Sequence, residues 1–138
     1  MKVRLFNKEK DYKTLCKWWD DWGSVKRGLE ELPNTGIIIS KNNIDMCIGF
    51  IYSTDSCITW FEHVIMNKKI TKEQRNGVLE KLLDSMVEKA KSMGFKLIMC
   101  FGTEKQDNIN PTLVKWRNKN IRDVVFNNIS HYYKIINK

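Results

Sequence analysis

The spacing of apolar residues divides the first part of the chain into a strand, a helix and a helical turn. Apolar and polar side chains alternate over residues 2–6, which predicts a strand. Over residues 9–22 the apolar positions recur every three or four residues, as in an amphipathic helix, and Gly23 is a suitable stop. A short helical turn is expected in residues 27–32, before a loop.

Three apolar segments separated by short turns follow that loop. They cover residues 36–40, 44–54 and 57–66, and the first turn contains Asn42 and Asn43. Apolar segments of this length, joined by such short connections, favour antiparallel pairing between neighbours in sequence. We therefore expect a three-stranded antiparallel meander.

Helical spacing returns in residues 71–95, where one stripe is apolar and the other face is charged and polar. The apolar run at residues 95–101 is typical of a buried strand that pairs in parallel with a neighbour. Residues 110–120 predict a second, shorter helix, and residues 124–136 predict one or two strands. The chain is therefore expected to form a single domain, residues 1–138, of mixed α+β or α/β class, with helices packed on a central sheet.

Composition and charge narrow the classes of function. Hydrophobic residues make up 42% of the chain, and no apolar run reaches the length of a membrane span or a signal-peptide core, so we expect a soluble cytoplasmic protein. The four cysteines and two histidines are isolated in sequence, which gives no zinc-ligand spacing and predicts no metal. The net charge is +8, and residues 96–138 carry eight basic and three acidic side chains. This excess favours an acidic partner, such as a phosphorylated cofactor, while no sequence motif supports nucleic-acid binding.

The junction between the third apolar strand and the long helix is a candidate anion site. Free backbone N–H groups and the positive end of the helix dipole both face a ligand at such a junction. The residues here are Gln74, Arg75, Asn76, Gly77 and Val78. Gly77 would let a phosphate approach the backbone without a Cβ atom in the way, although a single glycine at this place can also be accidental.

The same residues carry a resemblance to a known family. The segment from Gln74 to Leu79 resembles the Q/R-x-x-G-x-G/A motif of the GCN5-related N-acetyltransferase (GNAT) superfamily, matching it at Gln74 and Gly77. The order of elements also resembles that family over essentially the whole chain, and Asn110 has a counterpart at the start of the next helix. The phrases LCKWW-DWG, LPNTG and N-I-S-H-Y are similar to those of small GNAT-like proteins of bacteriophages. Leu79 departs from the motif, because it replaces the last Gly or Ala and either crowds a pyrophosphate or points inward.

The resemblance implies a mostly antiparallel mixed sheet flanked by helices on both faces, with acetyl-coenzyme A bound where two parallel strands splay apart. It assigns the acetyl-pantetheine arm to the backbone of the strand at Val64, Ile65 and Met66. The remaining cofactor-binding residues that it implies are Gln74, Arg75, Asn76, Gly77, Val78, Leu79, Asn110 and Arg117.

Acetyl transfer to an amine requires a base, and Glu62 is the carboxylate on the expected cofactor strand. Its alternative is a half-exposed strand residue paired with a lysine. Strand alternation predicts that His63 points to the opposite face, as a packed or surface histidine. Many family members have a tyrosine as general acid where this chain has Arg117, which cannot donate a proton at neutral pH. Tyr132 and Tyr133 on the last predicted strand are possible substitutes, and Tyr132 is also a candidate substrate contact.

Three tryptophans, Trp18, Trp19 and Trp22, fall within five positions. They could pack in the core, line a ligand site or form a surface that binds a partner. Helical spacing assigns Trp18 and Trp22 to packing and leaves Trp19 as a candidate substrate contact. The resulting hypothesis is an acetyl-CoA-dependent N-acetyltransferase that acts on a small amine, a protein lysine or an N-terminus, as a monomer or homodimer. The alternative is a GNAT-fold interaction module without turnover, for example a phage protein that inhibits a host factor.

Overall fold

The structure is a computed structural model that describes residues 1–103, 122–126 and 129–135, with side chains through residue 100. The helical elements are α1 (Lys8–Asp21), the 3-10 turn η1 (Leu29–Glu31), α2 (Lys72–Arg75) and α3 (Val78–Ser92). The strands are β1 (Lys2–Leu5), β2 (Thr35–Lys41), β3 (Ile44–Tyr52), β4 (Ile58–Met66), β5 (Leu97–Thr103), β6 (Arg122–Phe126) and β7 (Ile129–Ile135).

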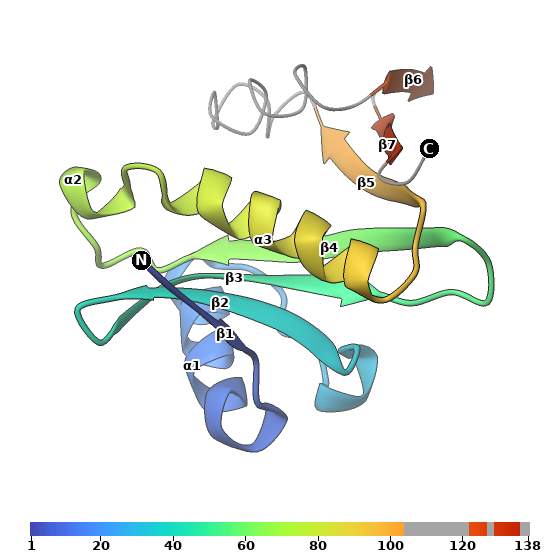
Figure 1. The fold of residues 1–138 in the computed structure, drawn as a ribbon. Coiled ribbons are helices and arrows are strands. Elements are labelled where there is room, and N and C mark those ends of the chain that lie inside the picture. The colour runs from blue at the N-terminus through green and yellow to red at the C-terminus, as the bar shows by residue number, and fades with distance from the viewer. Residues whose placement is uncertain (104–121, 127–128, 136–138) are drawn as a thin grey trace.

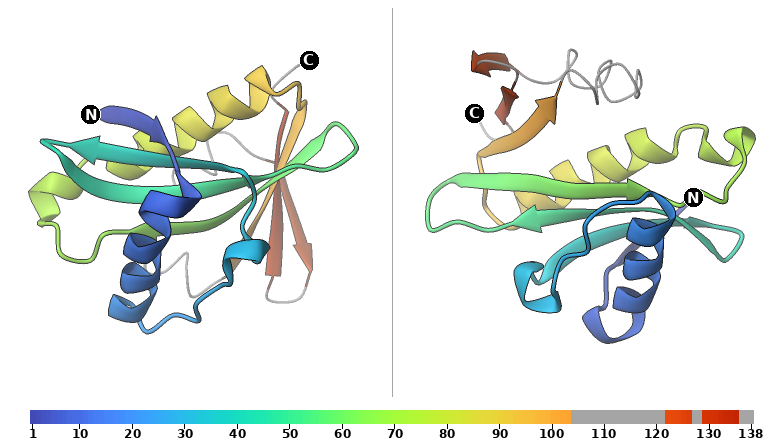
Figure 2. Two further views of the ribbon diagram at one scale, coloured as in Figure 1. Left: turned by 90° about the horizontal axis from the view of Figure 1, so that it is seen from below. Right: turned by 180° about the vertical axis from the view of Figure 1, so that it is seen from behind.

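The strands form one mixed sheet in the order β1-β2-β3-β4-β5-β7-β6. Its one parallel pair among the described strands is β4 with β5, and all the other pairs are antiparallel. Helix α3 covers one face of the sheet and α1 covers the other, as Figures 1 and 2 show. The predicted fold class is therefore confirmed.

Local sequence explains most of the element boundaries. The Asn7 side chain accepts hydrogen bonds from the N–H groups of Glu9 and Lys10, which caps the start of α1. Asn42 and Asn43 both have positive φ, at 52° and 61°, as the two-residue turn between β2 and β3 requires. The meander predicted for residues 36–66 is confirmed.

Two hydrophobic clusters lie on the two faces of the sheet. The α3-side cluster is mainly aliphatic, and Leu82 and Met86 of α3 are fully buried in it. The α1-side cluster is rich in aromatic rings, including Phe6, Trp18 and Phe50. Both faces therefore contribute to the core, with different kinds of side chain.

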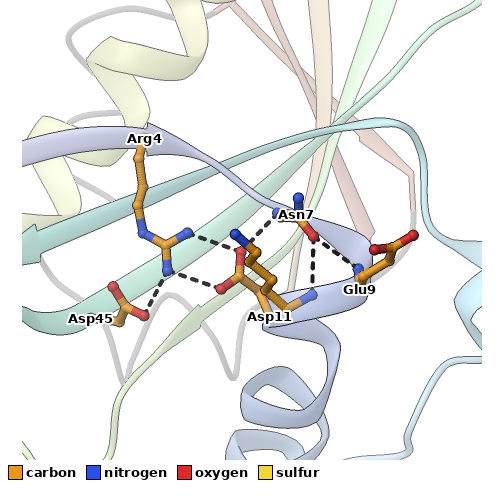
Figure 3. A network of polar contacts seen from close by, with 6 residues as sticks. Arg4, Asn7, Glu9, Asp11 and Asp45 are labelled. Carbon is orange, nitrogen blue, oxygen red and sulfur yellow. Dashed lines mark hydrogen bonds and ion pairs between the residues drawn. The ribbon is translucent and has the colours of Figure 1, made fainter.

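An ion-pair network ties β1, α1 and β3 together near the edge of the sheet (Figure 3). Arg4 donates to both carboxylate oxygens of Asp11, at 2.9 and 3.0 Å, and to Asp45 Oδ2 at 2.8 Å. The backbone N–H of Asn7 also donates to Asp11, at 2.7 Å. Burial opposes the charge of Asp11, but these hydrogen bonds outweigh it and leave the pKa of Asp11 below its ordinary value. The network therefore anchors α1 to the sheet.

The single long helix predicted for residues 71–95 is wrong at its beginning. The structure has a one-turn helix, α2, and a separate helix, α3, divided at Asn76 and Gly77. Gly77 has a φ of 74°, in the left-handed region, and stands at the N-cap of α3. Residues 71–77 contain no apolar side chain, so the apolar pattern could not mark where the long helix begins.

The structure describes part of the C-terminal region. The strand predicted for residues 95–101 is confirmed as β5, and the segment predicted as one or two strands contains β6 and β7. The helix predicted for residues 110–120 lies outside the described residues. Within the described part of the chain, no helix has the length and apolar character needed to cross a membrane.

Candidate functional site

The parallel strands β4 and β5 pair along the first part of β4 and then separate. Their registered pairs run from Ile58 with Leu97 to Phe61 with Cys100. Beyond Phe61, β4 continues to Met66 with β3 as its neighbour, while β5 continues beside β7. Figure 1 shows β5 diverging from β4. One edge of β4 over residues 62–66 therefore has no strand partner among the described strands, although the Met66 carbonyl accepts a hydrogen bond from the Trp22 indole.

A β-bulge interrupts β4 just beyond the last pair with β5. Phe50 of β3 lies opposite Glu62, and Ile48 lies opposite Ile65, so Gly49 alone faces both His63 and Val64. At this bulge His63 has a φ of 55°, in the left-handed region. The structure thus places a backbone irregularity where the two strands separate.

The prediction that His63 points away from Glu62 is wrong. Glu62 lies directly opposite Phe50, whose side chain belongs to the α1-side cluster. The His63 ring makes edge contacts on the same side, with ring centroids 6.4 Å from Trp19, 6.4 Å from Phe50 and 5.9 Å from Tyr52. The bulge breaks the alternation of β4, so both titratable side chains lie on the α1 side.

Burial shifts the pKa values of these two groups toward each other. Partial burial raises the pKa of Glu62, although a hydrogen bond from the His63 backbone and the nearby Arg27 charge oppose that rise. Burial and the charge of Arg27 lower the pKa of His63, while Glu31 opposes this. The rise in the pKa of Glu62 favours its protonated form, and the fall in the pKa of His63 favours the neutral imidazole, which is the form that can accept a proton.

The structure changes the roles predicted for the tryptophans. Trp18 is buried in the α1-side cluster, as predicted, and Trp19 is equally buried at 4% exposure, behind the His63 ring. Trp22 was predicted to pack in the core but is 44% exposed. Its indole N–H donates to the carbonyl of Met66 at 2.7 Å, and the Lys68 ammonium lies 5.0 Å from its ring centroid. Because Trp22 is the C-cap of α1, it lies past the regular helical stripe and reaches the end of β4.

The N-terminus of α3 lies beyond the end of β4 and presents unpaired amides. Gly77 provides no side-chain acceptor for the first turn of α3, so the first-turn N–H groups of Val78, Leu79 and Glu80 have no intrahelical partner. A Cβ atom on Gly77 would meet only the side-chain end of Met1 within 4 Å, at 3.6 Å, among the described atoms. The helix start is therefore open to an anion.

The side chains of the predicted motif residues are used in the fold itself. The Gln74 side chain accepts from the Thr71 N–H at 2.7 Å in a capping box, and Arg75 donates to the carbonyls of Lys68 and Ile70. Leu79, which departs from the motif, is buried in the α3-side cluster and thus points inward. These residues offer a ligand mainly backbone groups.

Several predicted residues fall where the structure gives little detail. Asn110 and Arg117 lie outside the described residues. Tyr132 lies in β7 opposite Cys100, and its side chain is outside the described part. Conversely, Tyr52, Arg27 and Glu31 join the group around Glu62 and His63, and sequence reasoning missed them. No local signal could have found them, because they belong to β3, a loop and η1.

Solved structures with the same architecture give this geometry its context. No protein-family model and no curated protein sequence matches the chain. An aminoglycoside 6'-acetyltransferase type Ii has a TM-score of 0.78 at 11% identity, over 100% of this chain and 99% of that one. A GNAT-family acetyltransferase of Staphylococcus aureus has a TM-score of 0.72 at 12% identity, over 99% of both chains. The chain has the GNAT fold.

An N-acetylglutamate synthase of Neisseria gonorrhoeae, solved with coenzyme A and L-arginine, also has this GNAT fold. Its TM-score is 0.76 at 10% identity, and the alignment covers 99% of this chain but 33% of the synthase. At such low identities the likeness concerns the fold. Specific residues and substrates do not follow from it.

Proposed function

We propose that this protein is an acetyl-CoA-dependent N-acetyltransferase that transfers the acetyl group directly to a primary amine in a ternary complex. The observation that carries the proposal is the separation of β4 from β5 beyond Phe61 and Cys100, which leaves a backbone edge of β4 free beside the open N-terminus of α3. Proteins of the same fold include one solved with coenzyme A and one described as an aminoglycoside acetyltransferase.

In the proposed complex, the extended pantetheine arm runs along Val64, Ile65 and Met66 and bonds to their backbone. The pyrophosphate lies at the start of α3, against the amides that follow Gly77. Gln74, Arg75 and Asn76 hold this turn in shape. Asn110, Arg117 and Tyr132 remain proposed contacts. The inward orientation of Leu79 removes the steric objection raised by its departure from the motif.

The proposed acceptor side lies on the α1 face of β4. Glu62 is the proposed catalytic carboxylate, which attracts the ammonium form of the acceptor and accepts a proton through water. Trp19 is too buried to line an open wall of the acceptor site. It is therefore proposed to contribute indirectly, by packing behind the His63 ring. The acceptor itself is proposed as a small amine or a protein amine.

The test is thermal unfolding with and without millimolar acetyl-CoA. A ligand that binds the native state stabilises it by about 2.7 kcal/mol at a hundredfold excess over its dissociation constant. We expect a clear rise in Tm for the wild type and none for Gly77→Glu, which adds a side chain and a negative charge at the phosphate position. Gly23→Glu is the matched control, since Gly23 also has positive φ but lies at the end of α1.

An unchanged wild-type Tm would refute the proposal. A rise in Tm that Gly77→Glu retains would place the cofactor elsewhere. A rise without release of coenzyme A thiol from any amine would instead support the interaction module without turnover.

A further inference from the structure

His63 has a backbone conformation that its position in the sequence does not explain. Three non-glycine residues in the described chain have positive φ, and two of them, Asn42 and Asn43, form a hairpin turn. His63 lies inside a nine-residue strand, where no turn requires this conformation. Non-glycine residues with positive φ are uncommon, and such strained conformations cluster at functional sites. The conformation therefore calls for a reason beyond chain reversal.

The geometric effect of this conformation is to move the imidazole to the α1 side of the sheet. In a regular strand, His63 and Glu62 would point to opposite faces. At the bulge, both lie on the α1 side, two residues or fewer beyond the last pair of β4 with β5. The bulge thus places a second titratable side chain close to the point where β4 and β5 separate, which is the proposed cofactor site.

Aromatic neighbours hold the ring in place without occupying its nitrogen atoms. Trp19, Phe50 and Tyr52 contact it edge to face from α1 and β3, at interplanar angles of 85°, 71° and 67°. In the described part of the chain, no residue forms a side-chain hydrogen bond with the imidazole, and the residue is half-buried. The ring is thus oriented by packing, and its nitrogen atoms remain available.

The charged and titratable groups around the ring come from four elements. Arg27 lies in the loop after α1, Glu31 in η1, Tyr52 in β3 and Glu62 in β4. Burial and Arg27 favour the neutral imidazole, and Glu31 partly offsets them. A neutral imidazole beside carboxylates can accept a proton from an ammonium group that these carboxylates attract.

We propose that His63 is a catalytic proton acceptor for the amine, working beside Glu62; this inference rests on the proposed acetyltransferase function. In this scheme Glu62 attracts the ammonium group, and the neutral His63 ring, in place of Glu62, takes one proton from it. The free amine then attacks the thioester carbonyl, the C–N bond forms and the C–S bond breaks. The second nitrogen proton goes to the sulfur, which gives coenzyme A thiol and the amide, and His63 releases its proton to solvent.

The test compares His63→Asn with Glu62→Gln in the full-length protein. Asparagine tolerates positive φ but cannot accept this proton, so the backbone is preserved while the base is removed. His131→Asn controls for loss of a histidine elsewhere. Thiol release is followed from pH 5 to 9 with spermidine, kanamycin and a peptide with a free N-terminal amine as probes, and acetyl-CoA binding is followed by thermal shift.

We expect kcat/KM of the wild type to bend below pH 6.5, the ordinary histidine value, and His63→Asn to lose that bend with a fall of about 100-fold in kcat. Glu62→Gln lowers kcat but keeps the bend. In the NMR spectrum, the His63 ring Cε1–H signal, assigned by its loss in His63→Asn, should titrate at the same pH and move when coenzyme A binds.

The outcomes separate the two proposals. Turnover in His63→Asn within twofold of the wild type, with an unchanged pH profile, would overturn the role of His63 and leave the acetyltransferase function standing. If acetyl-CoA binds but none of the probes reacts, an unmoved His63 signal would overturn the role and a shifted one would support it. Absence of any thermal shift would refute the proposed function, and the role of His63 with it.

Discussion

The two faces of the central sheet are each covered by a helix but are built from different kinds of side chain. Against α3, the buried side chains are mainly aliphatic, with no titratable carboxylate or histidine among them. Against α1, aromatic rings surround His63, and Glu62 lies beside it, while an ion-pair network fixes the helix at its other end. The aliphatic face contributes mainly packing and apolar burial. The aromatic face also orients polar groups, because rings restrict neighbours while leaving their edges accessible.

The strongest test of this comparison is a matched pair of cavity substitutions. Leu82→Ala on the α3 side and Leu15→Ala on the α1 side each remove a side chain with 0% exposure. Each should lower the free energy of unfolding by about 3 kcal/mol, measured in urea. Native tryptophan fluorescence should change in Leu15→Ala alone, since Trp18 and Trp19 share its cluster. An equal spectral change in Leu82→Ala would mean that the two faces are coupled through the sheet.

The ion-pair network gives the next largest effect. Asp11→Asn should lower the free energy of unfolding by about 2 kcal/mol at pH 7, because Arg4 loses its buried partner. Asp20→Asn is the control: its pair with Lys26 is exposed to solvent, so its loss should leave the free energy of unfolding nearly unchanged.

The Asp11 contribution also has a defined pH dependence. Because the folded state lowers the pKa of Asp11, its stabilisation is present above the unfolded pKa near 4 and is lost as the pH falls through the lower, folded value. The difference in free energy of unfolding between the wild type and Asp11→Asn should therefore become smaller in acid. A gap that stayed constant down to pH 2 would show that the network acts through packing alone.

A smaller effect is expected where α1 meets the end of β4. Trp22→Phe keeps an aromatic ring beneath Lys68 but removes the donor to the Met66 carbonyl, at a cost of about 1 kcal/mol. Amide hydrogen exchange of Asn67, which donates to Met46, should become faster. Tyr12→Phe removes a similar bond, to the Arg27 carbonyl, and should leave Asn67 protected. Unchanged exchange of Asn67 in Trp22→Phe would mean that the Trp22 hydrogen bond does not stabilise the end of β4.

The smallest effect should have the opposite sign. The pKa of Glu62 is raised in the folded protein, so its ionisation opposes folding as the pH rises through that value. Glu62→Gln should be as stable as the wild type below pH 4 and more stable at pH 7, by up to about 1 kcal/mol, since solvent screens a half-buried carboxylate. Lower stability of Glu62→Gln at pH 7 would mean that Glu62 is held by a favourable ion pair instead.

The sequence by itself determined the strands, the two main helices and the turn at Asn42 and Asn43. These depend on local preferences and on the period of the apolar residues, which are properties of a short segment. Gln74 and Gly77 pointed to the same helix start that the structure leaves open. The position of Glu62 on a strand also followed from the local pattern, while its catalytic role stays a proposal.

Tertiary structure alone decided how these residues face one another. Alternation predicted that His63 points away from Glu62, but pairing with β3 accommodates an extra residue in β4 and places both on one side. Periodicity placed Leu79 on the buried stripe of its helix, but it could not reveal the break at Gly77 or the reach of Trp22 to Met66. Each of these is settled by contacts between segments distant in the chain, which no local pattern records.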